Sequence, residues 1–159
     1  MADNDVERVW QLVEKISICM MATWDGNALH ARPMGAYPDR DAHTIYFLTD
    51  VRQHKDDELR RYPQLVLAFA DTGGQKYVSI SGEAEVSNDR AKIKDLWSTP
   101  AKAWWESADD PNIRVLKVTP HDAEFWDSPG TVASYISMAA AATMGGRPKV
   151  GEARKVDVS

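Results

Sequence analysis

The sequence contains one cysteine, which excludes an internal disulfide and a zinc site built on cysteine pairs. The apolar surroundings of Cys19 favour a core position over an activated thiol. Basic residues are outnumbered, because 19 Lys and Arg face 24 Asp and Glu, and the formal net charge of −5 disfavours binding to nucleic acid by charge. No apolar run approaches the roughly 20 residues that cross a bilayer, and the opening MADNDVERVW lacks the basic and apolar regions of a secretion signal. We therefore expect a soluble, cytoplasmic protein without nucleic-acid or membrane partners.

Apolar spacing divides the chain into one longer helix and a series of strands. Val6, Val9, Leu12 and Val13 recur at steps of three and four, which predicts an amphipathic helix over residues 2–15. Charged stretches at 55–62 and 89–97 predict two further short helices, and the Trp-rich segment 98–112 is typical of a loop with one helical turn. Strands are predicted at 17–24, 28–37, 44–49, 64–71 and 76–87, with a strand pair over 113–127.

The strands do not alternate regularly with helices, so the pattern predicts a mainly β (α+β) protein built on an antiparallel barrel. Gly82, inside the strand at 76–87, predicts a bulge or a close backbone approach. We expect residues 1–130 to form the barrel domain. Residues 131–159 would carry an Ala-rich helix over 134–144, a turn at Gly145-Gly146, and an end that forms an edge strand over 155–158 or stays disordered.

The segment from Leu29 to Lys55 offers the parts that bind a flavin mononucleotide (FMN). A flavin needs an apolar slot for its ring, polar groups at the ring edge, and cations for its phosphate. Arg32 lies in one predicted strand and Lys55 opens a predicted helix, so both could place a positive charge on a phosphate. Taken alone, each residue is more often a solvated surface side chain.

The order of ARPM, YFLTD, Lys55, YVSISGEAEV, a Trp-rich stretch and the ending DDPNIRVLKVTPHDAEFWD resembles the pyridoxamine 5′-phosphate oxidase-like FMN-binding split barrels. The general stress protein branch is the most similar, and the likeness covers about Val6 to Asp127. It implies a six-stranded antiparallel split barrel with short flanking helices. It also implies a homodimer that binds FMN, with FAD as a second candidate, between its subunits.

The resemblance also implies which residues contact the cofactor. Arg32 would bind the phosphate or the ring edge, and Lys55 would neutralise phosphate charge with the amides that begin its helix. Trp126 and Trp104 would approach the ring from the partner subunit, although packing in the core or at a dimer interface is the favoured role for at least two of the four tryptophans at 97, 104, 105 and 126. The cofactor-binding residues expected on this basis are Arg32, Pro33, Met34, Leu48, Thr49, Gln53, His54, Lys55, Trp104 and Trp126.

Three departures from the family pattern argue against a true pyridoxamine phosphate oxidase. Gln53 and His54 stand where the oxidases place Ser-Arg, which would weaken phosphate binding or make it pH-dependent, unless His54 is simply a loop histidine. Tyr37 replaces the lysine that grips substrate phosphate, and Trp126 is followed by DSPGTV in place of the Arg-x-His substrate segment.

No side chain stands out as a general acid, so the catalytic residues are unknown. We expect a flavin-dependent oxidoreductase of unidentified substrate that exchanges hydride with a nicotinamide or a small acceptor. One alternative is a flavin-binding stress protein that stores or senses flavin without turnover. Another is a split barrel that binds a deazaflavin or haem, with His30 or His121 as axial ligand. The four histidines lack the spacing of metal ligands, so no metal site is expected.

Overall fold

The computed structural model describes residues 2–98, 100–129, 131–145 and 153–159. The elements in chain order are α1 (Ala2–Ile16), β1 (Ile18–Trp24), β2 (Leu29–Gly35), β3 (Tyr37–Asp39), β4 (Thr44–Asp50), the 3₁₀ turn η1 (Val51–Gln53), α2 (Lys55–Arg61), β5 (Gln64–Asp71), β6 (Lys76–Ser87), α3 (Arg90–Leu96), the 3₁₀ turn η2 (Pro100–Ala103), β7 (Ile113–Asp127), α4 (Thr131–Met144) and β8 (Ala153–Asp157).

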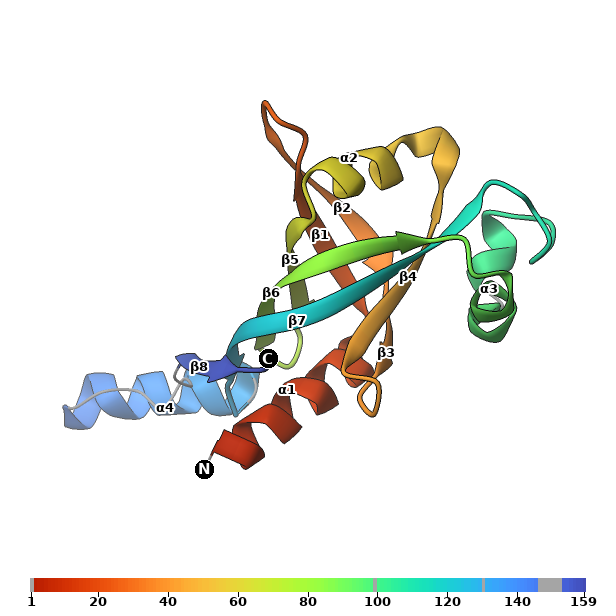
Figure 1. Cartoon of the computed structure of the whole chain (residues 1–159). Helices are drawn as coiled ribbons and strands as arrows, with labels where there is room; N and C mark the ends of the chain where they lie inside the picture. Colours follow the sequence, from red (N-terminus) through yellow and green to blue (C-terminus); the bar gives the residue numbers. More distant parts are fainter. Residues whose placement is uncertain (1, 99, 130, 146–152) are drawn as a thin grey trace.

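The strands form one antiparallel sheet in the order β2-β1-β5-β6-β7-β4-β3, with β8 paired to β7. The sheet curls on itself and remains open between its edges, with α2 across one end and α1 near the other (Figure 1). The predicted antiparallel split barrel is therefore confirmed. The described sheet has eight strands, more than the six expected, because β3 and β8 add short strands at its margins.

Strict alternation along the central strands builds the core. In β1 and β5 every second side chain is buried, and Met21, Leu67 and Phe69 are at most 1% exposed. Leu12 and Val13 of α1 join the same cluster, so α1 closes this end of the barrel with its apolar face. Cys19 lies there too, as expected, and burial raises the pKa of its thiol to about 12.

The strand pair expected over 113–127 is wrong, because β7 is one continuous strand of 15 residues. A proline within a strand lacks the amide that would donate to the ladder. Pro120 instead lies at an irregularity: it pairs with Gly82, whereas the next pair joins Ser81 to Asp122. The bulge expected at Gly82 is thus confirmed, and a Cβ there would lie only 2.5 Å from the carbonyl oxygen of Thr119.

The C-terminal segment leaves the barrel and returns to it. Helix α4 points away from the sheet, and β8 runs back along the end of β7 (Figure 1). Val156 and Val158 are buried in the barrel core, which favours the edge-strand alternative for this end of the chain. Gly145 adopts a left-handed φ of 77° after α4, whereas the second glycine of the expected turn lies outside the described residues.

The predicted strand over 28–37 is divided, and the predicted helical turn at 98–112 is present as η2. Ala36 separates β2 from β3 because its amide donates to the carbonyl of Ser17, 2.7 Å away, rather than to a neighbouring strand. None of the helices in the described ranges has the length and apolar character needed to span a membrane.

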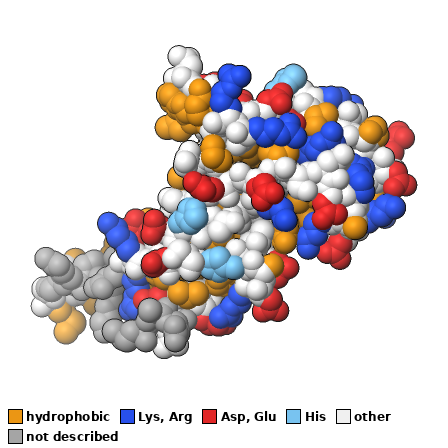
Figure 2. All heavy atoms as spheres, viewed as in Figure 1, with side chains coloured by type: hydrophobic (Ala, Val, Ile, Leu, Met, Phe, Trp, Pro, Cys, Tyr) orange, Lys and Arg blue, Asp and Glu red, His pale blue; other side chains and the backbone are white. Residues whose placement is uncertain are grey.

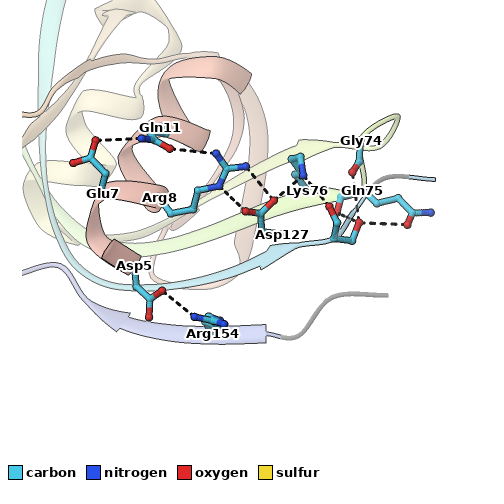
Figure 3. Close-up of polar contacts among 10 residues, drawn as sticks. Asp5, Glu7, Arg8, Gln11, Gly74, Gln75, Lys76, Asp127 and Arg154 are labelled. Atoms are coloured by element: carbon cyan, nitrogen blue, oxygen red, sulfur yellow. Dashed lines mark hydrogen bonds and ion pairs between the residues drawn. The ribbon is translucent and has the colours of Figure 1, made fainter. Parts of the chain in front are cut away.

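A polar network ties α1 to the ends of β6 and β7 (Figure 3). Arg8 Nε lies 2.5 Å from one carboxylate oxygen of Asp127, and Lys76 Nζ lies 2.7 Å from the other. The hydrogen bond from Arg8, supported by Lys76, lowers the pKa of Asp127 to about 2. This network fixes the end of β7, where Trp126 is located.

Candidate functional site

Residues from β2, β4 and α2 meet on the inner side of the open edge of the barrel. Arg32 and Met34 pair with Met21 and Cys19, so they share the inward face of the sheet. Helix α2 packs against β1 and β4, and its first residue is Lys55. We call Arg32, Thr49 and Lys55 the basic cradle.

Lys55 is the most unusual member of the basic cradle, because its side chain is 1% exposed. Its Nζ donates to the thioether sulfur of Met34 at 3.0 Å, and no carboxylate of the described residues lies within ion-pair distance of it. Burial lowers the pKa of Lys55 to about 8; the charge of Arg32 adds to this shift, and that of Glu58 opposes it. A buried ammonium without a counter-anion is costly, so this position favours an anionic ligand.

Arg32 reaches the same region from β2 with part of its guanidinium open to solvent. Its Nη2 donates to Thr23 Oγ1 at 3.4 Å and lies 3.6 Å from Glu58 Oε2. These are long contacts, and the side chain keeps 26% of its surface exposed. The guanidinium is therefore positioned near Lys55 while most of its donors remain available.

Thr49 contributes a buried hydroxyl from β4. Alternation places Thr49 on the same inward face as Ile45 and Phe47, and its Oγ1 has no hydrogen-bond partner among the described residues. Asp56, beside Lys55, likewise has one buried carboxylate oxygen without a partner in the described part of the chain. Buried polar atoms are normally paired, so such orphaned atoms indicate missing ligand or water.

The loop that leads into Lys55 is held by Asp50. Its carboxylate accepts from the indole nitrogen of Trp105 at 2.9 Å and from the backbone and side chain of Arg52. The hydrogen bond from the Arg52 side chain holds the pKa of Asp50 far below its usual range. His54 follows with a left-handed φ of 59°, a conformation rare for a residue with a side chain and often found where function imposes it.

Some of the expected cofactor residues lie apart from the basic cradle within one chain. Gln53 and His54 are exposed, and Leu48 packs outward with Trp105. Trp104 is 73% exposed near η2. Two more point away from the barrel interior: Pro33, which pairs with Met20, and Trp126, which pairs with Tyr77 at the end of β7 remote from α2 (Figure 1).

Sequence reasoning missed Thr23, Asp50 and Glu58. Glu58 follows Lys55 by three residues, the spacing that brings side chains to one face of a helix, so the segment KDDEL carried a signal. Thr23 and Asp50 become visible only through strand pairing and packing.

The alternative haem ligands occupy ordinary surface positions. His30 lies 2.8 Å from Asp25, and His121 lies 3.9 Å from Glu83, each pair partly exposed. Within the described residues, no group of three His, Cys, Asp or Glu side chains is arranged to hold a metal ion.

A family model described as pyridoxamine 5′-phosphate oxidase-like matches residues 4–149. The chain belongs to the pyridoxamine 5′-phosphate oxidase-like family. The chain is also 30% identical over 120 residues to general stress protein 26 of Bacillus subtilis (strain 168). This match covers 73% of the chain and 84% of that protein.

Solved structures agree with this pyridoxamine 5′-phosphate oxidase-like assignment. A protein assigned as a general stress protein 26 from Jannaschia sp. CCS1 is 28% identical, with a TM-score of 0.79 and 99% of both chains covered. The general stress FMN/FAD binding protein from Xanthomonas citri is 27% identical, with a TM-score of 0.69, and the match covers 78% of this chain and 89% of that one.

Proposed function

We propose that this chain binds FMN at the basic cradle and acts as a flavin-dependent oxidoreductase. The observation that carries the proposal is the buried ammonium of Lys55, which forms no ion pair among the described residues and lies near the half-buried guanidinium of Arg32. Thr49 adds a buried hydroxyl that has no hydrogen-bond partner in the described part of the chain. A phosphate would supply the missing charge to Lys55, accept from Arg32, and accept from Thr49. The Xanthomonas citri relative is named as an FMN/FAD binding protein, which supports a flavin at this site, and FAD is therefore a second ligand to test.

The partner in this proposal is a second copy of the chain. The outward face of β2, β1, β5 and β6 carries several exposed apolar side chains, which are Leu29, Ile18, Met20, Trp24, Val66 and Tyr77. Figure 2 shows apolar side chains gathered where the hairpin joins β1 to β2. Exposed apolar patches of this kind mark interaction surfaces. Trp126 lies on the same face, so a symmetric dimer would offer it to the partner's flavin rather than to its own.

The protein itself would position the flavin and supply the charged groups that bind its phosphate. Bound FMN supplies hydride transfer, with a nicotinamide or small acceptor as the other reactant. Lys55, Arg32 and Thr49 would fix the phosphate, Pro33 and Met34 would offer backbone groups to the ring, and Trp126 of the partner subunit would exclude water from it. Gln53 and His54, both exposed, would contribute weakly to the phosphate site.

The proposal is tested by titrating the protein with FMN and with riboflavin while flavin fluorescence is followed. FMN should bind at least about tenfold tighter than riboflavin, because the basic cradle recognises the phosphate that riboflavin lacks. Equal affinities would show that the cradle does not hold phosphate.

Addition of NADPH to the FMN complex then separates enzyme from carrier. Bleaching of the flavin absorbance with continued consumption of NADPH in air supports the oxidoreductase. Flavin that binds tightly but stays oxidised in the presence of NADPH or NADH supports a protein that stores or senses flavin.

A further inference from the structure

Glu58 places a negative charge inside the region that the proposed function assigns to phosphate. Its Oε2 lies 3.6 Å from Arg32 Nη2 and accepts from Thr23 Oγ1 at 3.4 Å, while Arg32 also donates to Thr23. The three side chains come from α2, β2 and β1, so the contact closes the space between the helix and the edge of the barrel. Glu58 also acts on Lys55, whose positive charge it favours.

The contact between Glu58 and Arg32 is loose enough for another anion to take the place of Glu58. Glu58 and Arg32 meet through one atom pair beyond hydrogen-bond length, and both side chains keep about a quarter of their surface exposed. The nearby pair of Asp50 and Arg52 is different, because two guanidinium nitrogens lie 2.5 and 2.9 Å from the carboxylate. Asp50 is thus fixed to its partner, whereas Glu58 is held loosely.

A phosphate at Arg32 would meet this carboxylate at close range. Like charges a few ångströms apart repel, and the repulsion is stronger where water is partly excluded. The incoming anion must therefore displace Glu58 from Arg32 or bind beside it at a loss of affinity. Small inorganic anions have no other contacts to offset that loss, whereas a ligand with a bound ring does.

We infer that Glu58 is a resident counter-anion of the basic cradle, which competes with phosphate for Arg32 and so weakens the binding of phosphate-bearing ligands relative to uncharged ones. The flavin part of this inference rests on the proposed function, but the competition at Arg32 applies to any phosphate. Glu58 thus sets how strongly the site prefers a phosphate-bearing ligand to its uncharged counterpart.

The test compares Glu58→Gln with Asp57→Asn. Asp57 precedes Glu58 on α2, is 67% exposed and contacts His54 and Arg60, so its substitution removes the same charge away from Arg32. Two affinities are measured for each variant: that for inorganic phosphate, from the rise in Tm with phosphate concentration, and that for FMN, by fluorescence with riboflavin as reference.

Glu58→Gln should bind both inorganic phosphate and FMN about fivefold tighter than the original chain, the ratio expected when a partly exposed charge pair is removed. Riboflavin affinity should not change. Asp57→Asn should shift each affinity by less than about twofold. Glu58→Asp, whose shorter side chain draws the carboxylate back from Arg32, should fall between, and it replaces Glu58→Gln as the test if the latter does not fold.

The inference is overturned if Glu58→Gln, or Glu58→Asp in its place, binds phosphate no tighter than the original chain. Its failure is distinct from failure of the proposed function. Tighter phosphate binding by Glu58→Gln in a protein that ignores FMN would support the competition and reject the flavin. Good FMN binding that Glu58→Gln leaves unchanged, together with unchanged phosphate binding, would support the flavin and reject the competition.

Discussion

Lys55 is the residue on which the account of the site depends. Its neighbours are the sulfur of Met34, the positively charged Arg32 and the negatively charged Glu58. Neither charged group forms an ion pair with Lys55. Folding therefore buries an ammonium in a position that does not stabilise it. Function can impose such a cost, because a ligand-binding residue need not be the residue that folds best.

Replacement of Lys55 by methionine should raise the free energy of unfolding of the ligand-free protein by about 1–3 kcal/mol at pH 7, since a buried charge is exchanged for an apolar side chain of similar length. The folded-state pKa of about 8 lies below the usual lysine pKa of 10.5, so the penalty is full below pH 8 and disappears as the pH rises toward 10.5. Urea denaturation at pH 7 and pH 10 measures both points: the gain should shrink at pH 10.

Lys94→Met is the matched control, because Lys94 on α3 is 63% exposed and forms only a surface ion pair with Asp109, 3.5 Å away. This variant should leave stability within about 0.5 kcal/mol of the original. A loss of stability in Lys55→Met at pH 7 would contradict the view that the ammonium is uncompensated.

At this scale the sequence identified residue types but not their environments. Arg32 and Lys55 were identified through a family resemblance, whereas no pattern in the amino-acid sequence indicated that Lys55 would be buried and Arg32 half-buried. Glu58 was overlooked because a charged helix is usually a solvated one. Burial depends on how α2 crosses the barrel, which is a property of tertiary packing.

At the scale of elements, the end of β7 depends on the network around Asp127. Its pKa is lowered to about 2, first by the hydrogen bond from Arg8 and then by Lys76, so it stabilises the fold above about pH 4 and this contribution is lost as the pH falls toward 2. Asp127→Asn should therefore reduce the free energy of unfolding by about 1 kcal/mol at pH 7, a figure that allows for partial exposure of the pair.

The difference in free energy of unfolding between Asp127→Asn and the original chain should become smaller as the pH falls from about 4 to about 2. Denaturant unfolding at each pH measures this difference. Asp122→Asn supplies the control, because Asp122 lies on the same strand with an exposed side chain. An Asp127→Asn variant that is as stable as the control would show that the network is only a surface contact.

Strands were predicted well where a run of strand-forming residues was clear, and less well over 113–127. The alternation in β6 was visible in the sequence, and so was the bulge at Gly82, whereas β1 and β5 were identified as apolar runs. The strand pair expected over 113–127 is one strand, in which Pro120 lies opposite Gly82 at the point where the ladder is irregular. The pairing of two distant residues decided the outcome, and no local pattern contains it.

At the scale of the whole molecule, the account requires a dimer. Met20 lies at the centre of the apolar outward face and is 43% exposed. Met20→Glu should convert a dimer into monomer in sedimentation experiments, because a buried unpaired charge would weaken the interface by several kcal/mol. FMN affinity should fall with it, since Trp126 of the partner subunit would be lost from the site.

Ala91→Glu introduces the same charge on the exposed side of α3 and should leave the dimer intact. A native chain that sediments as a monomer at micromolar concentration while holding FMN would contradict the shared site. The proposed dimer follows at the level of sequence only from the family resemblance, because the order of four strands in the sheet brings the exposed apolar side chains to one face.

The central claim is that Lys55 and its neighbours hold the phosphate of a flavin. The most direct measurement is the absorbance spectrum of the protein after incubation with excess FMN and removal of free ligand by gel filtration. The account predicts about one flavin per subunit in the original chain and in Lys94→Met, and none in Lys55→Met. Flavin retained equally by Lys55→Met, or a colourless original chain, would contradict it.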